Sequence, residues 1–288
     1  MPQSNEFLKK IKNLEIKTRH LVDGIITGNY DSIFKGQGIE FSEIRDYRIG
    51  DDIRAIDWKV TARFNQPYIK EFIEERDLQV YFVIDVSGSG NFGSNISKKE
   101  KSLEIIASLM FAALRNNDEI GVFLISEGIE KFIPAKKGKR HVLQILNFIS
   151  NYKPKSLKTN LQNCLEYVSK TIKRKSVVFL VSDFNDETNF FKPLKILRKN
   201  NDVVALKLTD PREQVIPDVG LIELEDQETG EQILVDTSDE NFREKYSKLI
   251  SDKNSQFFSE MKRQKIDAVS LTTEEDFSIP IRKLFKRR

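Results

Sequence analysis

Apolar runs alternate with amphipathic stretches through most of the chain. Short runs rich in β-branched residues predict buried strands at 80–84, 120–126, 176–182, 203–208 and 266–271. Between them, apolar residues at helical spacing predict helices over 99–116, 139–152, 159–172 and 191–197. Strands that alternate with helices in this way are typical of a doubly wound α/β fold, so we expect a mostly parallel sheet. The run 129–134 follows a Glu-Gly turn and predicts an antiparallel edge strand.

The first 78 residues follow a different pattern. Apolar residues at helical spacing over 7–14 predict an N-terminal helix. Alternation at 39–41 and again at 56–60 predicts two half-buried strands. We therefore expect an N-terminal helix and strand-rich segment over 1–78 and the sheet domain over 79–288.

The predicted sheet domain carries one insertion. Two short apolar runs flank Glu228-Thr229-Gly230, and the glycine suits the positive φ of a hairpin turn. This pattern predicts a β-hairpin at about 215–237. A long helix over about 240–263 and a final helix with a basic tail at 282–288 follow it.

Composition narrows the classes of protein that the chain can belong to. Of its 288 residues 39% are hydrophobic and 32% charged, and the 47 basic residues nearly balance the 44 acidic ones. A net charge of +3 does not indicate the excess of basic residues that is typical of nucleic-acid-binding proteins. No apolar run approaches the roughly 20 residues of a membrane span, and the first ten residues do not resemble a signal peptide. With a single cysteine, we expect a cytoplasmic protein without a membrane span.

Three polar stretches lie after or between the predicted strands. Asp85-Val86-Ser87-Gly88-Ser89 follows one strand, Asp183 ends another, and Thr159 precedes an amphipathic run. Ligand crevices of open α/β sheets lie outside the carboxyl ends of the strands. Carboxylate and hydroxyl oxygens suit a hard divalent ion such as Mg²⁺ or Mn²⁺. Taken singly, each stretch also has a simpler interpretation, since Asp and Ser favour turns and Thr favours a helix N-cap.

These residues resemble the metal-ion-dependent adhesion site of von Willebrand factor A domains. That site combines Asp-x-Ser-x-Ser with a distant Thr and a distant Asp. The resemblance implies one Mg²⁺ or Mn²⁺ ion, with its metal residues at Asp85, Ser87, Ser89, Thr159 and Asp183. It also implies that the protein leaves one coordination position open, which the Asp or Glu of a partner protein fills.

Two other motifs compete for the same loop. Gly88 to Gly93 spells G-x-G-x-x-G after a strand, as in dinucleotide-binding folds. That fingerprint needs a helix that opens at the glycines, and here a polar stretch comes first. Asp85 could also be a phosphate-accepting nucleophile, but Ser87 stands where haloacid-dehalogenase-like phosphatases need a second Asp.

A longer signature covers the N-terminal part. It consists of 36–41, 45–47, 50–54 and 56–63, together with the later Asp210-Pro211-Arg212-Glu213. The signature resembles the domain-of-unknown-function 58 family, a von Willebrand A-like group of bacterial proteins. The resemblance implies pairing with a MoxR-type AAA+ ATPase and a role as an adaptor in the remodelling or maturation of client proteins.

From these features we expect a metal-dependent protein-interaction module rather than an enzyme. Two alternatives stay open. One is a Mg²⁺-dependent phosphoester hydrolase, although a general base is not evident and the carboxylates are few for a two-metal site. The other is a metal-free structural scaffold.

Overall fold

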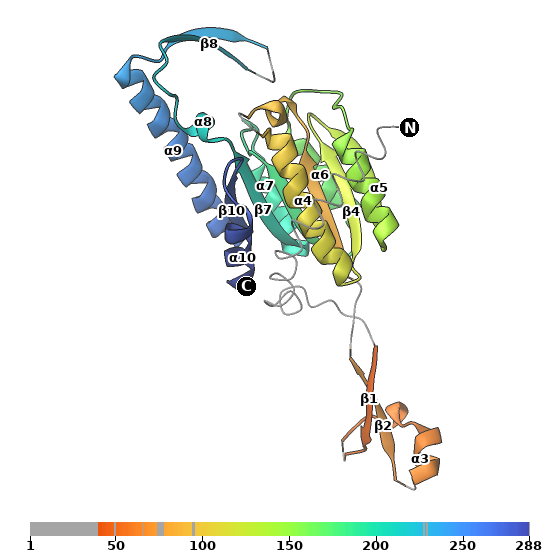
Figure 1. Cartoon of the computed structure of the whole chain (residues 1–288). Coiled ribbons are helices and arrows are strands. Elements are labelled where there is room, and N and C mark those ends of the chain that lie inside the picture. The colour runs from red at the N-terminus through yellow and green to blue at the C-terminus, as the bar shows by residue number, and fades with distance from the viewer. Residues whose placement is uncertain are drawn as a thin grey trace. The chain divides into compact units, whose positions relative to one another are not determined.

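The computed structural model describes residues 40–48, 50–64, 66–73, 78–93, 96–226, 228 and 230–287. The helix predicted over 7–14 lies outside these residues. The described residues fall into two compact units, one within 34–78 and the other within 79–288 (Figure 1). Each unit is described below by itself.

The larger unit is built on a six-stranded sheet with the strand order β10-β7-β6-β3-β4-β5. Its strands are β3 (Gln79–Asp85), β4 (Glu119–Ile125), β5 (Ile129–Lys136), β6 (Val177–Ser182), β7 (Asp202–Thr209) and β10 (Asp267–Thr272). Every neighbouring pair is parallel except β4 and β5, so β5 is the antiparallel edge strand that the turn predicted. The doubly wound, mostly parallel fold class is confirmed.

Helices cover both faces of this sheet (Figure 1). One face packs against α6 (Leu161–Thr171), α7 (Phe191–Asn200) and α9 (Glu240–Arg263), and the other against α4 (Lys98–Arg115), α5 (Lys139–Ser150) and α10 (Ser278–Lys286). Alternation along β3 sends Tyr81 and Val83 into the first layer. Phe82 points the opposite way and stacks on Phe179, with 5.3 Å between the ring centroids.

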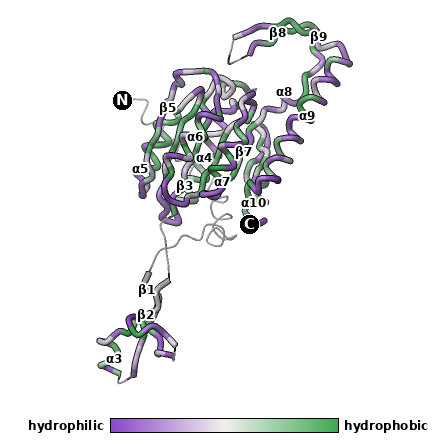
Figure 2. Tube along the Cα trace, turned by 180° about the vertical axis from the view of Figure 1, so that it is seen from behind, coloured by the Kyte–Doolittle hydropathy of each residue, from purple (hydrophilic) through white to green (hydrophobic). Residues whose placement is uncertain are grey.

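The hydrophobic positions gather in the strands of this sheet, whereas α9 is largely hydrophilic along its length (Figure 2). Strands buried on both faces read as continuous apolar runs, which explains why the sequence located them well. Because β3, β4, β6, β7 and β10 run in the same direction, all of their carboxyl ends lie at one edge of the sheet. The polar loops that follow them therefore meet at that edge.

The insertion leaves the sheet after β7. It comprises the short helix α8 (Pro211–Gln214) and the strands β8 (Leu221–Glu225) and β9 (Gln232–Asp236), which form a separate two-stranded antiparallel sheet. Figure 1 shows this hairpin as an arm between α8 and α9. None of the helices in the described residues combines the length and the apolar character that a membrane span requires.

In the smaller unit, β1 (Glu40–Asp46) pairs in antiparallel fashion with β2 (Tyr68–Ile73). The strand predicted over 56–60 is wrong: a 3-10 helix η1 (Ile53–Ala55) and the helix α3 (Trp58–Phe64) fill this part of the chain. The cause lies in Asp57, whose carboxylate accepts hydrogen bonds from the backbone N–H groups of Lys59 and Val60 at 3.0 and 3.3 Å. This helix-capping interaction outweighs the apolar alternation.

Gly121 in β4 offers a test of the close packing around β3. A Cβ atom at this position would overlap the ring of Tyr81 and come within 3.0 Å of the backbone nitrogen of Ala135. We predict that Gly121→Ala lowers the free energy of unfolding by about 1–3 kcal/mol through overpacking, as measured by urea denaturation. Gly128→Ala is the matched control, because a Cβ there would meet nothing within 4 Å. Equal stability of the two variants would contradict this packing.

Candidate metal centre

Asp85 and Ser182 meet where β3 and β6 end. The two strands pair in parallel with Ile84 opposite Val181, so their last residues are neighbours across the sheet. The hydroxyl of Ser182 donates to Asp85 Oδ2 at 2.7 Å, and the backbone N–H of Ser87 donates to Asp85 Oδ1 at 3.0 Å. Both donors are neutral, so these contacts orient the Asp85 carboxylate without balancing its charge.

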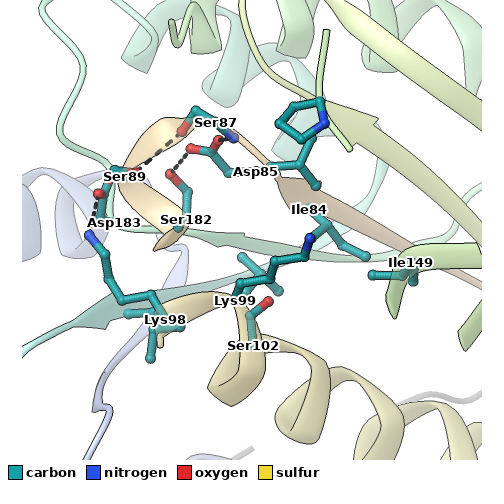
Figure 3. Close-up of a pocket in the computed structure, with 15 residues that line it drawn as sticks. Ile84, Asp85, Ser87, Ser89, Lys98, Lys99, Ser102, Ile149, Ser182 and Asp183 are labelled. Carbon is teal, nitrogen blue, oxygen red and sulfur yellow. Dashed lines mark hydrogen bonds and ion pairs between the residues drawn. The ribbon is translucent and has the colours of Figure 1, made fainter. Parts of the chain in front are cut away.

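The two serines of the Asp-x-Ser-x-Ser stretch face the same point (Figure 3). Ser87 precedes the 3-10 helix η2 (Gly88–Asn91), which turns the chain so that the hydroxyl oxygens of Ser87 and Ser89 lie 3.3 Å apart. Against the effect of burial, Ser89 also lowers the pKa of Asp183, the residue after β6. Asp85, Ser87, Ser89, Ser182 and Asp183 all line one pocket.

A buried lysine joins this pocket to α8. The ammonium group of Lys98, the first residue of α4, lies 2.8 Å from Asp183 Oδ2 and 2.6 Å from Glu213 Oε1. Only 4% of the Lys98 side chain is exposed. A second buried lysine, Lys207, donates to the backbone oxygen of Asp183 at 2.7 Å. The Asp183 loop is therefore held by two cationic side chains.

The electrostatics of the two carboxylates differ for this reason. Burial raises the pKa of Asp85 to about 6, and the negative charge of Asp183 adds to the effect. Burial acts in the same direction on Asp183, but the ammonium group of Lys98 outweighs it and lowers the pKa of that carboxyl. Burial lowers the pKa of Lys98, but the negative charges of Asp183 and Glu213 outweigh burial, so the pKa of Lys98 is raised. Lys98 thus acts as an internal cation for Asp183.

Thr159 lies in the adjoining loop but does not line the pocket. The loops touch through the backbone, since Gly88 N–H donates to the oxygen of Leu157 at 2.9 Å. The Thr159 hydroxyl donates to Glu228 Oε1 at 2.7 Å, and its backbone N–H donates to Glu228 Oε2 at 3.2 Å. The simpler interpretation of Thr159 as a helix N-cap is wrong, because Asn160 is the N-cap of α6. Of the five predicted metal residues, four share the pocket and Thr159 is bonded to the hairpin.

The donor set of the pocket suits a hard cation. Its polar lining offers hydroxyl and carboxylate oxygens, which Mg²⁺ and Mn²⁺ prefer. Adjacent ligands of an octahedral Mg²⁺ ion, each about 2.1 Å from the metal, lie about 3 Å apart, close to the separation of the Ser87 and Ser89 oxygens. No group of three or more His, Cys, Asp or Glu side chains placed to hold a metal occurs in the described residues. A cation here would therefore rely on hydroxyl groups.

Four residues of this arrangement were missed by the sequence reasoning: Ser182, Lys98, Glu213 and Glu228. Two of them carry a local signal. Ser182 is the last residue of a predicted strand, directly before Asp183. Glu213 closes a capping box with Asp210, and proline follows Asp210 at the start of α8, a typical helix-start pattern.

The dinucleotide interpretation of Gly88 to Gly93 is not supported. The glycine stretch begins a 3-10 turn, and α4 begins only at Lys98 behind its own N-cap, Ser97. The helix N-terminus therefore does not open at the glycines, as a pyrophosphate site requires.

Comparisons with known proteins show related chains. A family model described as "Protein of unknown function DUF58" matches residues 43–256. The uncharacterized protein Rv1480 of Mycobacterium tuberculosis is 28% identical over 223 residues, which cover 76% of this chain and 70% of that protein.

Two solved structures are also similar. The conserved hypothetical protein BatB from Bacteroides thetaiotaomicron has 16% identity and a TM-score of 0.49, over 73% of this chain and 98% of that one. Proximal thread matrix protein 1 from the mussel byssus, in a structure described as having a zinc-occupied MIDAS motif, has 19% identity and a TM-score of 0.38, over 46% of this chain and 38% of that one. Both TM-scores are low, so the fold is assigned from the sheet itself.

The buried ion pairs of Lys98 can be tested by removing the charge. We predict that Lys98→Met lowers the free energy of unfolding by about 3–5 kcal/mol in urea denaturation, because it leaves two carboxylates without their cation. Arg263→Met is the control, since Arg263 is 77% exposed beside Glu260 and its loss should change stability by less than about 1 kcal/mol. A Lys98 variant as stable as the control would contradict this account.

Proposed function

The chain belongs to the DUF58 family, and from this membership and the geometry of its pocket we propose that it is a metal-dependent protein-interaction module, not an enzyme. The observation that carries the proposal is the convergence of side-chain oxygens from the loops after β3 and β6. Asp85, Ser87, Ser89, Ser182 and Asp183 line one pocket at the carboxyl edge of the sheet, and hydrogen bonds join Asp85 to Ser182 and Ser87, and Ser87 to Ser89. Ligands of open α/β sheets bind at this edge.

Each residue has a distinct part in the proposed site. The hydroxyl groups of Ser87 and Ser89 would hold one Mg²⁺ or Mn²⁺ ion at the pocket, and Thr159 would add a third hydroxyl from the adjoining loop. The carboxylates of Asp85 and Asp183 would balance the charge of the ion. Ser182 orients Asp85 by donating to Oδ2. The bound ion supplies a Lewis-acidic position for a carboxylate from a partner protein.

A metal-free scaffold is the second candidate, and one observation favours it. The ammonium group of Lys98 already pairs with Asp183 at 2.8 Å, so part of the charge that would attract a cation is balanced within the chain. The carboxylate of Asp85 distinguishes the two candidates. Its hydrogen-bond donors from Ser87 and Ser182 are neutral, so they leave its negative charge for a cation to balance. Nothing in the described residues favours the phosphoester hydrolase.

The partner is proposed from the family resemblance. The N-terminal signature and the Asp-x-Ser-x-Ser stretch are similar to those of proteins that pair with MoxR-type AAA+ ATPases. We therefore assign to this chain an adaptor role, in which an acidic side chain of the ATPase or of a client protein contacts the pocket. The role of the ATPase would be the remodelling or maturation of the client.

The metal can be tested by titration calorimetry with Mn²⁺. We predict that the wild-type chain binds one ion and that Asp85→Asn, which keeps the side-chain shape, weakens binding by at least about 10–100-fold. Asp252→Asn on the exposed surface of α9 should bind as the wild type does. Circular dichroism confirms that both variants fold. An Asp85→Asn variant that binds Mn²⁺ normally would contradict the site, and a wild-type chain that binds none would favour the scaffold.

The partner proposal makes a separate prediction. A MoxR-type ATPase from the same organism, purified and immobilised, should retain the wild-type chain in Mg²⁺ and release it in EDTA. Asp85→Asn should not be retained in either buffer, whereas Asp252→Asn should follow the wild type. Retention that is unchanged by EDTA would contradict a metal-dependent contact.

A further inference from the structure

The hairpin of β8 and β9 is exposed for most of its length. Its strands pair only with each other among the described residues, and Leu221, Ile233 and Leu234 are each at least 60% exposed. The base is anchored by Thr237, a buried residue whose hydroxyl donates to the oxygen of Gly220 at 2.6 Å. The strands themselves thus have little core to hold them, and the contacts at the tip determine where the tip lies.

The tip reaches the candidate site through one side chain. Glu228 accepts two hydrogen bonds from Thr159, one from the hydroxyl at 2.7 Å and one from the backbone N–H at 3.2 Å. The turn presents this carboxylate in a defined geometry, because the backbone N–H of Glu228 donates to Asp226 Oδ1 at 2.7 Å and that of Gly230 donates to the oxygen of Asp226 at 2.8 Å. The Glu228 carboxylate is therefore hydrogen-bonded to Thr159, one of the residues proposed to bind the metal.

The base of the insertion contacts the same site from another side. Glu213 in α8 pairs with Lys98 at 2.6 Å, and Lys98 pairs with Asp183 (Figure 3 shows the latter pair). The hydroxyl of Tyr246 in α9 donates to the backbone oxygen of Glu213 at 2.9 Å, which fixes α8 against the helix that follows the hairpin. The insertion is thus connected to the site twice, at its base through Lys98 and at its tip through Thr159.

The two connections differ in how easily they break. The base connection runs through a lysine side chain that is 4% exposed, and removing such a pair from its partners is unfavourable. At the tip, Thr159 and Glu228 are both partly exposed, so water can replace each hydrogen bond when the tip leaves. The tip can therefore open while the base stays in place.

We propose that Glu228 is a tethered carboxylate that covers the site at Thr159, so that the acidic side chain of a partner binds only after it displaces the hairpin tip. This inference rests on the proposed function, because it assigns the carboxylate position of the same site. It identifies the partner feature as an acidic residue on an exposed turn, the form in which Glu228 itself is presented. The hydroxyl of Thr159 donates a hydrogen bond to Glu228, so its lone pairs stay available for a cation.

Tethering gives the internal carboxylate a strong advantage. A ligand attached by a short linker acts at an effective concentration of about a millimolar, so a free partner at lower concentration competes poorly. Removing the Glu228 charge should therefore strengthen the binding of an external carboxylate. The control is Glu223→Gln, which removes one exposed acid from β8 of the same hairpin.

The contact is tested first by hydrogen exchange at the Thr159 amide, followed by NMR. Glu228→Gln should raise its exchange rate by about tenfold or more relative to wild type, because a neutral amide with one acceptor oxygen replaces a charged carboxylate that accepts from both Thr159 donors. Glu223→Gln should leave the rate unchanged, and equal melting temperatures exclude global unfolding as the cause. An unchanged rate in Glu228→Gln overturns the proposal.

The competition is tested with a fluorescent cyclic peptide of the chain's own residues 221–236 in Mg²⁺. The peptide should bind Glu228→Gln at least about tenfold more tightly than it binds wild type or Glu223→Gln. The same peptide with Gln in place of Glu228 should bind none of them. Equal binding to all three chains overturns the tethered-carboxylate proposal even where Mn²⁺ titration shows a metal site. A gain in Glu228→Gln that persists in EDTA supports the tethered carboxylate and overturns the proposed metal dependence.

Discussion

The parallel pairing of β3 with β6 is the constraint on which the site depends. It brings the ends of two buried strands together and with them Asp85 and Asp183. Two carboxylates in a poorly solvated place repel each other, so the loops around them must supply donors and positive charge. Ser182 and the Ser87 N–H group supply the donors for Asp85, and Lys98 supplies the charge for Asp183. The same lysine joins the first residue of α4 to the loop after β6 and to α8.

Two side chains of the chain itself approach the candidate site: the Lys98 ammonium group at the pocket, and the Glu228 carboxylate at Thr159 in the adjoining loop. Lys98 stands beside Asp183, where it offsets the charge that a divalent ion would balance, and Glu228 accepts hydrogen bonds from Thr159. On partner binding, the proposed module would exchange the contact between Glu228 and Thr159 for a contact with an acidic side chain of the partner.

The sequence predicted the fold well, and it predicted four of the residues that line the pocket, for physical reasons. Strands buried on both faces leave continuous apolar runs, and an Asp or Ser after such a run points to the edge of the sheet. The error at 56–60 arose because Asp57 caps a helix that the apolar alternation hid. The contacts of Lys98 with Asp183 and Glu213, and of Thr159 with Glu228, join residues 85, 115 and 69 positions apart. Contacts between such distant residues leave no local pattern, so the sequence could not reveal them.

The central claim is that hydroxyl and carboxylate oxygens at this edge hold a divalent ion. The most direct measurement is anomalous scattering from crystals of the chain grown with Mn²⁺. The account predicts one Mn²⁺ ion in contact with the hydroxyl oxygens of Ser87 and Ser89. A pocket without Mn²⁺ at a saturating concentration, with Lys98 still paired with Asp183, would contradict it.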